Sequence, residues 1–105
     1  MIEAREWERQ KGESRQAFAA FCVYRDLGAT RTAMGVQQQC NKSASLITKW
    51  SAKWRWVERA AAYDAYMARL EQAARETALV AEAEKWAQRR IEEREREYEI
   101  GRAHV

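Results

Sequence analysis

Between Val57 and Ile100 the chain contains neither proline nor glycine, and this run most constrains the fold. Ala, Leu, Glu, Gln and Arg fill most of it, and these residues are strong helix formers. The whole chain of 105 residues has no proline and only four glycines. A β-rich fold needs many tight turns, which these two residue types usually supply. The sequence therefore predicts an all-α protein.

A continuous helix over this run would be on the order of 65 Å long, at about 1.5 Å per residue, and a small domain cannot cover that length. We therefore expect residues 60–105 to form an oligomerisation segment. A break into two antiparallel helices around Glu82 to Lys85 remains an alternative. A run of alternating four- and three-residue steps, typical of a coiled-coil seam, comprises Tyr63, Met67, Leu70, Ala74, Thr77 and Ala81.

Three shorter helices are predicted before the long one. Ser14 is a good N-cap for the first helix, and Gly28 lies where a glycine commonly ends one. Thr30 is expected to cap the second helix, and Ser43 the third. Asn41 tolerates a left-handed conformation, so we expect the chain to turn there. The expected core positions of the first two helices are Phe18, Phe21, Val23, Tyr24 and Leu27, then Ala33, Val36 and Cys40.

The third helix has two chemically different faces. At about 100° per residue, the inward arc comprises Ile47, Trp50, Trp54 and Val57, and Trp56 lies off this arc at the junction with the next helix. We expect Trp50 and Trp54 to pack in the core rather than to stack on bases. The outward arc comprises Ser45, Thr48, Ala52 and Arg55, with Lys49 at its edge.

Charge is unevenly distributed along the chain. Residues 14–59 carry eight basic groups against two acidic ones, whereas residues 1–13 and 60–105 are both net acidic. A local excess of positive charge is typical of proteins that bind polyanions, and small or cationic side chains on an outward helix face suit a DNA major groove. A solvated surface on a plain three-helix bundle would produce a similar pattern.

These patterns divide the chain into three parts. Residues 1–13 form an N-terminal arm, and residues 60–105 the long helix or helical hairpin. Residues 14–59 are predicted to form a three-helix, homeodomain-like helix-turn-helix domain. We expect phosphate contacts from the cations and base contacts from the small polar residues. The predicted DNA-binding residues are Arg31, Lys42, Ser43, Ser45, Thr48, Lys49, Lys53 and Arg55.

No catalytic or cofactor motif stands out in the sequence. There is no phosphate-binding Gly-rich loop, and no HExxH. Cys22 and Cys40 match no zinc spacing, and the single histidine is His104. We therefore expect a non-enzyme without metal or cofactor. No stretch has the roughly 20 apolar residues of a membrane span, and the N-terminus does not resemble a secretory signal, so we expect two free thiols in a cytoplasmic protein.

The segments ESRQAFAAFCVYRDLGATRT and NKSASLITKWSAKWRWVERAAAYD resemble the small terminase subunits of tailed bacteriophages. The resemblance covers about half of the chain, and the closing Trp-x-Trp-Val-x-Arg-Ala is its most specific part. Gln37 and Asn41 depart from the family pattern, which usually has Ala and Gly there. The resemblance to the family is carried by Ser14, Ala17, Phe18, Tyr24, Arg25, Asp26, Arg31, Thr32, Lys42, Ser43, Trp50, Ser51, Trp54, Trp56, Val57, Arg59, Ala60, Tyr63 and Asp64.

This resemblance implies a DNA-recognition subunit of a viral packaging motor in the host cytoplasm. Such a subunit would form a ring-shaped homo-oligomer, bind double-stranded viral DNA where packaging begins, and present it to a large subunit with ATPase and nuclease activity. The chain is shorter than most family members, so it is either a compact member or a fragment. Two alternatives remain: a helix-turn-helix transcriptional regulator, and a helical scaffold that docks another protein without binding DNA.

Overall fold

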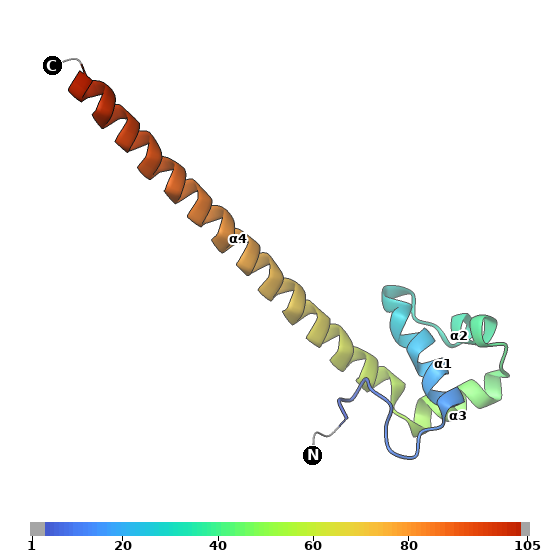
Figure 1. The fold of residues 1–105 in the computed structure, drawn as a ribbon. Coiled ribbons are helices and arrows are strands. Elements are labelled where there is room, and N and C mark those ends of the chain that lie inside the picture. The colour runs from blue at the N-terminus through green and yellow to red at the C-terminus, as the bar shows by residue number, and fades with distance from the viewer. Residues whose placement is uncertain (1–3, 104–105) are drawn as a thin grey trace. The chain divides into compact units, whose positions relative to one another are not determined.

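The computed structural model describes residues 4–103, and within that range it contains helices and turns but no strand (Figure 1). The elements in chain order are α1 (Arg15–Asp26), a short 3-10 helix η1 (Gly28–Thr30), α2 (Ala33–Cys40), α3 (Ala44–Lys53) and α4 (Trp56–Ala103). The predicted all-α class is confirmed. Residues 1–3 of the predicted arm and His104 lie outside the described residues.

The chain divides into two compact units, Met1–Ala68 and Arg69–Val105. The first unit contains the three short helices, the N-terminal segment and the beginning of α4. This unit therefore includes residues 60–68 of α4 together with residues 14–59. The second unit is the remainder of α4.

Helix α1 begins and ends where its local sequence predicts. The Oγ of Ser14 accepts a hydrogen bond from the backbone N–H of Ala17 at 3.1 Å, as an N-cap does. Gly28 follows the C-cap residue Leu27 and has a φ of 58°, a left-handed conformation that glycine adopts without steric cost. Both predicted boundaries are confirmed.

The predicted start of α2 is wrong by two residues. Thr30 belongs to η1, where its Oγ1 donates a hydrogen bond to the carbonyl of Leu27 at 2.7 Å. The chain becomes extended only at Arg31 and Thr32, and Thr32 Oγ1 then accepts from Gly35 N at 3.0 Å. The extra 3-10 turn thus moves the cap from one threonine to the other.

A three-residue turn joins α2 to α3. Asn41 has φ 53° and ψ 45°, the left-handed conformation expected for it, and its N–H bonds to the carbonyl of Gln37. Ser43 then caps α3, because its Oγ accepts from Leu46 N at 3.2 Å. Helix α1 contacts both α2 and α3, which contact each other.

The core of the first unit lies where these helices meet the beginning of α4. Its buried side chains are Ala20, Phe21, Val36, Ile47, Trp56 and Ala60, and Phe18, Val23, Tyr24, Leu27, Cys40, Trp50 and Trp54 pack around them, partly exposed. The predicted inward positions of Trp50 and Trp54 are confirmed. Ala33, expected on the buried face of α2, is exposed at the first position of that helix.

The junction between α3 and α4 reverses two expectations about the core. Val57, predicted to point inward, is 68% exposed, whereas Trp56, predicted off the core arc, is only 1% exposed. Helix α3 ends at Lys53, and Arg55 has a φ of 52°, so the 100° progression of α3 does not continue to these residues. A helix wheel that is continued past the end of a helix assigns the following residues to the wrong face.

The N-terminal segment is bound to the first unit by a buried arginine. The guanidinium of Arg59 makes two hydrogen bonds to the carboxylate of Glu13, at 2.9 and 3.0 Å, and both side chains are almost fully buried. It also donates to the carbonyls of Glu6, Glu8 and Trp54 at 2.6, 3.0 and 3.0 Å. One cation therefore joins the N-terminal segment, the end of α3 and the beginning of α4.

Aromatic packing adds a second attachment of the same segment. The rings of Trp7 and Tyr66 are stacked with centroids 4.7 Å apart, and Trp7 meets Tyr63 edge-on at 6.2 Å. The guanidinium of Arg5 lies 4.8 Å from the Tyr66 ring centroid. The segment expected to be an arm is therefore packed against α4 over the residues described.

In the second unit α4 is unbroken, so the helical hairpin considered for the region around Glu82 to Lys85 does not occur in the described chain. Every described side chain from Arg69 to Gly101 is exposed. Large apolar side chains that are at least 46% exposed in this unit are Leu70, Leu79, Val80, Trp86, Ile91, Tyr98 and Ile100. No helix in the described part of the chain is apolar over the length that a bilayer requires.

Candidate nucleic-acid interface

Helix α3 presents a face with no acidic side chain. Its sequence, ASLITKWSAK, contains two lysines and no Asp or Glu. Burial of Ile47 against α1 and α2 fixes the rotation of the helix, so that the opposite side faces solvent. The exposed residues on that side are Ser45, Thr48, Lys49, Ala52 and Lys53. All of these except Lys53 belong to the predicted outward arc.

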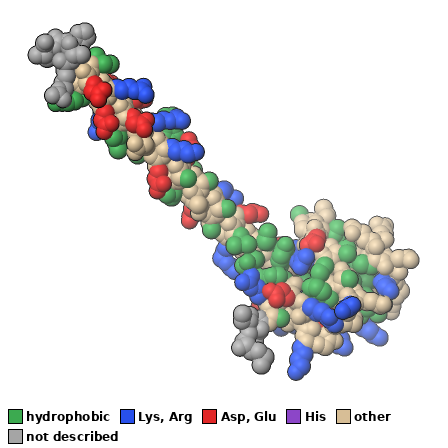
Figure 2. Space-filling view, in the orientation of Figure 1, with side chains coloured by type: hydrophobic (Ala, Val, Ile, Leu, Met, Phe, Trp, Pro, Cys, Tyr) green, Lys and Arg blue, Asp and Glu red, His purple; other side chains and the backbone are tan. Residues whose placement is uncertain are grey.

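The lysines of this region have no carboxylate partner. Within the described residues, no ion pair involves Lys42, Lys49 or Lys53. The Nζ of Lys53 lies 5.3 Å from the centroid of the Trp54 ring. Figure 2 shows Lys and Arg side chains over the visible face of the first unit. These three ammonium groups are therefore free to meet an anion.

Most arginines of the basic region, in contrast, are already paired. Arg25 forms an ion pair with Asp26 at 2.9 Å, and Arg59 is buried against Glu13. The hydrogen bond with Asp26 also raises the pKa of Arg25 above its ordinary value, which burial opposes. The cationic character of the surface therefore comes more from lysine than the sequence count suggests.

Arg31 occupies a structural position rather than the exposed one expected of a phosphate contact. Its side chain is 15% exposed and forms two hydrogen bonds with Asp64, including Nη2 to Oδ1 at 2.7 Å. It also donates to the carbonyls of Tyr24 and Arg25. The hydrogen bonds from Arg31 hold the pKa of Asp64 below its ordinary value and raise the pKa of Arg31 itself. The guanidinium of Arg31 is therefore already engaged by partners within the protein.

Arg55 is exposed, as predicted, but it lies beyond the end of α3. Its left-handed backbone places it in the junction between α3 and α4, and its Nε donates to Glu58 Oε2 at 2.6 Å. Both side chains are more than 60% exposed. Because solvent competes for so open a pair, the guanidinium can exchange Glu58 for another anion.

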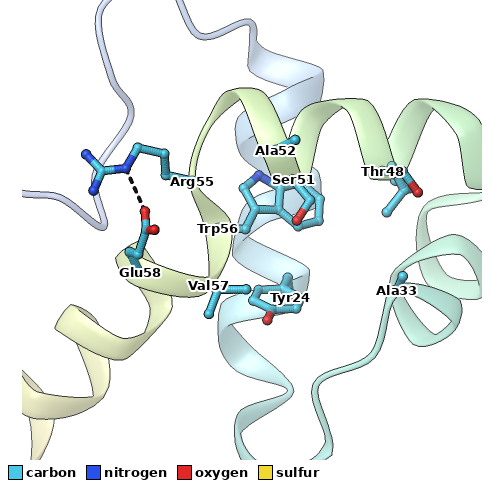
Figure 3. Close-up of a pocket in the computed structure, with 10 residues that line it drawn as sticks. Tyr24, Ala33, Thr48, Ser51, Ala52, Arg55, Trp56, Val57 and Glu58 are labelled. Carbon is cyan, nitrogen blue, oxygen red and sulfur yellow. Dashed lines mark hydrogen bonds and ion pairs between the residues drawn. The ribbon is translucent and has the colours of Figure 1, made fainter.

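A hollow of about 390 Å³ lies beside the exposed face of α3 (Figure 3). It is open to solvent, and it combines apolar and hydroxyl-bearing side chains with the Arg55–Glu58 pair at one side. Thr48 and Ala52 belong both to the hollow and to the exposed face of α3. Its lining is completed by Tyr24, Ala33, Ile47, Ser51, Trp56 and Val57.

The two long-range arginine ion pairs of the first unit are not indicated by the sequence. The partners of Arg59 and Arg31 lie 46 and 33 positions away along the chain, so no local pattern indicated them. The Trp-x-Trp-Val-x-Arg segment contributes to the family resemblance, but nothing in it indicates that its arginine, Arg59, binds Glu13. Tertiary packing alone brings Glu13 and Asp64 to these arginines.

Other reactive groups form no site of their own. Cys22 and Cys40 are both free and partly exposed, and burial raises the pKa of the Cys22 thiol above its ordinary value. Among the residues described, no group of three or more His, Cys, Asp or Glu side chains is placed to hold a metal ion. The exposed basic face of α3 and the adjacent hollow are therefore the best-formed candidate site.

Comparison with known proteins adds no identification, because no family model, curated protein or solved structure matches the chain.

Proposed function

We propose that this protein binds double-stranded DNA through the outward face of α3. The observation that carries the proposal is the absence of any acidic residue from α3, together with three lysines that have no carboxylate partner in the described structure. Such a face can approach the phosphates of both groove edges, while Ser45 and Thr48 are small enough to reach bases.

The arrangement of α2 and α3 supports a helix-turn-helix mode of binding. Three residues, Asn41 to Ser43, join the two helices, and α1 packs against both. In this mode the second helix of the pair enters the major groove. Lys42 and Ser43 would then lie at its N-terminal end, Lys49 and Lys53 along its length, and Arg55 just beyond it.

The biological role that we propose is that of a terminase small subunit. It rests on the resemblance carried by the segments around Tyr24–Asp26 and Trp50–Asp64. In that role the protein recognises viral DNA at packaging initiation and presents it to the ATPase and nuclease of the large subunit. The exposed apolar side chains of α4 support a homo-oligomer, in which several weak DNA contacts would act together.

The surface is tested by the double variant Lys49→Gln/Lys53→Gln in duplex DNA binding at several salt concentrations. We expect weaker binding and a salt slope smaller by about 0.9 for each lost phosphate contact. The matched control, Lys85→Gln/Arg90→Gln, removes the same charge from the second unit and should leave the slope unchanged. An unaltered slope in the first variant would rule out this face.

Native mass spectrometry with and without duplex DNA tests the role. A higher cyclic oligomer that binds DNA is the result expected of a packaging subunit. A two-fold dimer that prefers palindromic half-sites would instead identify a transcriptional regulator. An assembly that binds no duplex would contradict DNA binding altogether.

A further inference from the structure

We propose that the hollow beside α3 receives the C5-methyl group of a thymine, so that this protein prefers A·T pairs at that point of its site. The inference rests on the proposed function, because it requires α3 to lie in the major groove. It adds a base preference and assigns it to a particular concavity (Figure 3).

The lining of the hollow is suited to a methyl group. Ala33, Ala52 and Val57 contribute methyl groups, and Val57 is 68% exposed although it is a large apolar residue. Ile47 and Trp56 are buried and underlie it. Thymine is distinguished from the other bases in the major groove by its C5-methyl, which small apolar side chains recognise by contact.

The same lining is poorly suited to reading purines. Guanine and adenine are read by the paired donors and acceptors of Arg, Asn or Gln side chains. No amide side chain lines the hollow, and its one guanidinium, that of Arg55, is exposed in an open pair with Glu58, which suits a phosphate contact rather than a base contact. The hydroxyl groups of Thr48 and Ser51 fit the O4 acceptor next to the thymine methyl.

Charge around the hollow favours DNA over an apolar peptide or a small molecule as its occupant. Thr48 and Ala52, which line the hollow, belong to a helix without acidic residues. Lys49 does not line the hollow, but it follows Thr48 on the exposed side of the same helix and has no carboxylate partner in the described structure. The one acidic residue that lines the hollow, Glu58, lies beside the cationic Arg55. An anionic backbone beside the hollow therefore meets positive charge, while a base edge meets the apolar surface.

The direct test removes or adds only the methyl group. Binding of the full chain is measured for alternating duplexes of dA and dT against dA and dU, and of dG and dC against dG and 5-methyl-dC. Burial of one methyl group corresponds to about fourfold in affinity. We expect about that loss from thymine to uracil, and a gain when cytosine carries the methyl.

A matched pair of protein variants locates the effect. Val57→Thr keeps the side-chain shape and replaces a methyl in the hollow with a hydroxyl; because Val57 is exposed, the core is preserved. Val80→Thr makes the same change in the second unit, where Val80 is 58% exposed. We expect the thymine-to-uracil affinity ratio to fall towards one in Val57→Thr and to stay unchanged in Val80→Thr.

The outcomes separate this inference from the function on which it rests. Equal binding of thymine and uracil duplexes, or an unchanged ratio in Val57→Thr, would overturn the methyl site and leave DNA binding intact. No binding to any of the four duplexes would overturn both.

Discussion

At the scale of single residues, the arginines of this protein divide into those that build the first unit and those that remain at its surface. Arg59 is buried with Glu13, whereas Arg55 and Glu58 form an open pair. A buried pair is costly to break because removal of one partner leaves the other charge uncompensated, but an exposed pair contributes little. The two ion pairs have similar distances, but we expect the loss of one partner to reduce the stability of the fold much more for Arg59 and Glu13 than for Arg55 and Glu58.

Glu13→Gln is expected to destabilise the protein strongly. The change leaves the buried guanidinium of Arg59 without its carboxylate, which typically costs about 3–5 kcal/mol. The free energy of unfolding in urea, followed by tryptophan fluorescence, measures this loss.

Glu58→Gln is the matched control, since it removes the partner of an exposed arginine. We expect its effect to be below about 1 kcal/mol. If both variants lost the same small amount, Glu13 and Arg59 would not be the attachment described here.

Asp64→Asn is expected to act in a pH-dependent way. Because Arg31 lowers the pKa of Asp64 in the folded protein, the carboxylate stabilises the fold above its unfolded pKa of about 3.9. That stabilisation is lost as the pH falls through the lower, folded pKa. Asp64 is half exposed, so we expect a difference of less than about 1 kcal/mol between the two proteins.

Urea unfolding of wild type and Asp64→Asn between pH 7 and pH 2.5 checks this expectation. The difference in stability should be constant above about pH 5 and should shrink below about pH 4. A difference that grew on acidification would have the wrong sign for this ion pair.

At the scale of helices, local sequence determines most boundaries in the first unit. Ser14, Asn41 and Ser43 act as predicted because a cap depends on a few neighbouring backbone groups. The error at Thr30 is also local. Thr30 and Thr32 could both cap α2, but Thr30 lies in the 3-10 turn, so that Thr32 is the N-cap. The predictions for Trp56 and Val57 fail because the left-handed Arg55 changes the helix phase before them.

Ser43→Ala tests the cap at the beginning of α3. Loss of the Oγ acceptor leaves the N–H of Leu46 without this partner, and we expect about 1 kcal/mol of destabilisation. Ser45→Ala removes an exposed hydroxyl from the same helix turn and should leave stability within about 0.5 kcal/mol. Thermal or urea unfolding of the two variants distinguishes them, and equal stabilities would contradict the cap.

At the scale of the whole molecule, the two units have different sources of stability. The first unit has its own buried core and buried ion pair. The second is a helix whose described side chains are all exposed, and a helix in proteins derives most of its stability from packing. Tyr63, placed at the start of the predicted seam, instead packs against Trp7 in the first unit, so an intermolecular seam is expected only from Leu70 onwards.

A fragment of residues 1–68 is therefore expected to fold and remain monomeric, while the full chain self-associates. Sedimentation equilibrium measures the masses, and near-ultraviolet circular dichroism compares the packing of the aromatic residues. The fragment should keep that spectrum and bind duplex DNA more weakly than the full chain, because avidity is lost. A full chain that stayed monomeric would contradict the proposed assembly.

What the sequence determined by itself was local: the all-α class, the caps at Ser14 and Ser43, the turn at Asn41 and the polar outer face of α3. Each depends on helix propensity or on side chains within a few positions of one another. What only the tertiary structure decided was the choice of partners: Glu13 for Arg59, Asp64 for Arg31, and Trp56 rather than Val57 for the core. These outcomes depend on how helices meet across 30 or more residues and on a change of phase at Arg55, which a helical repeat does not encode.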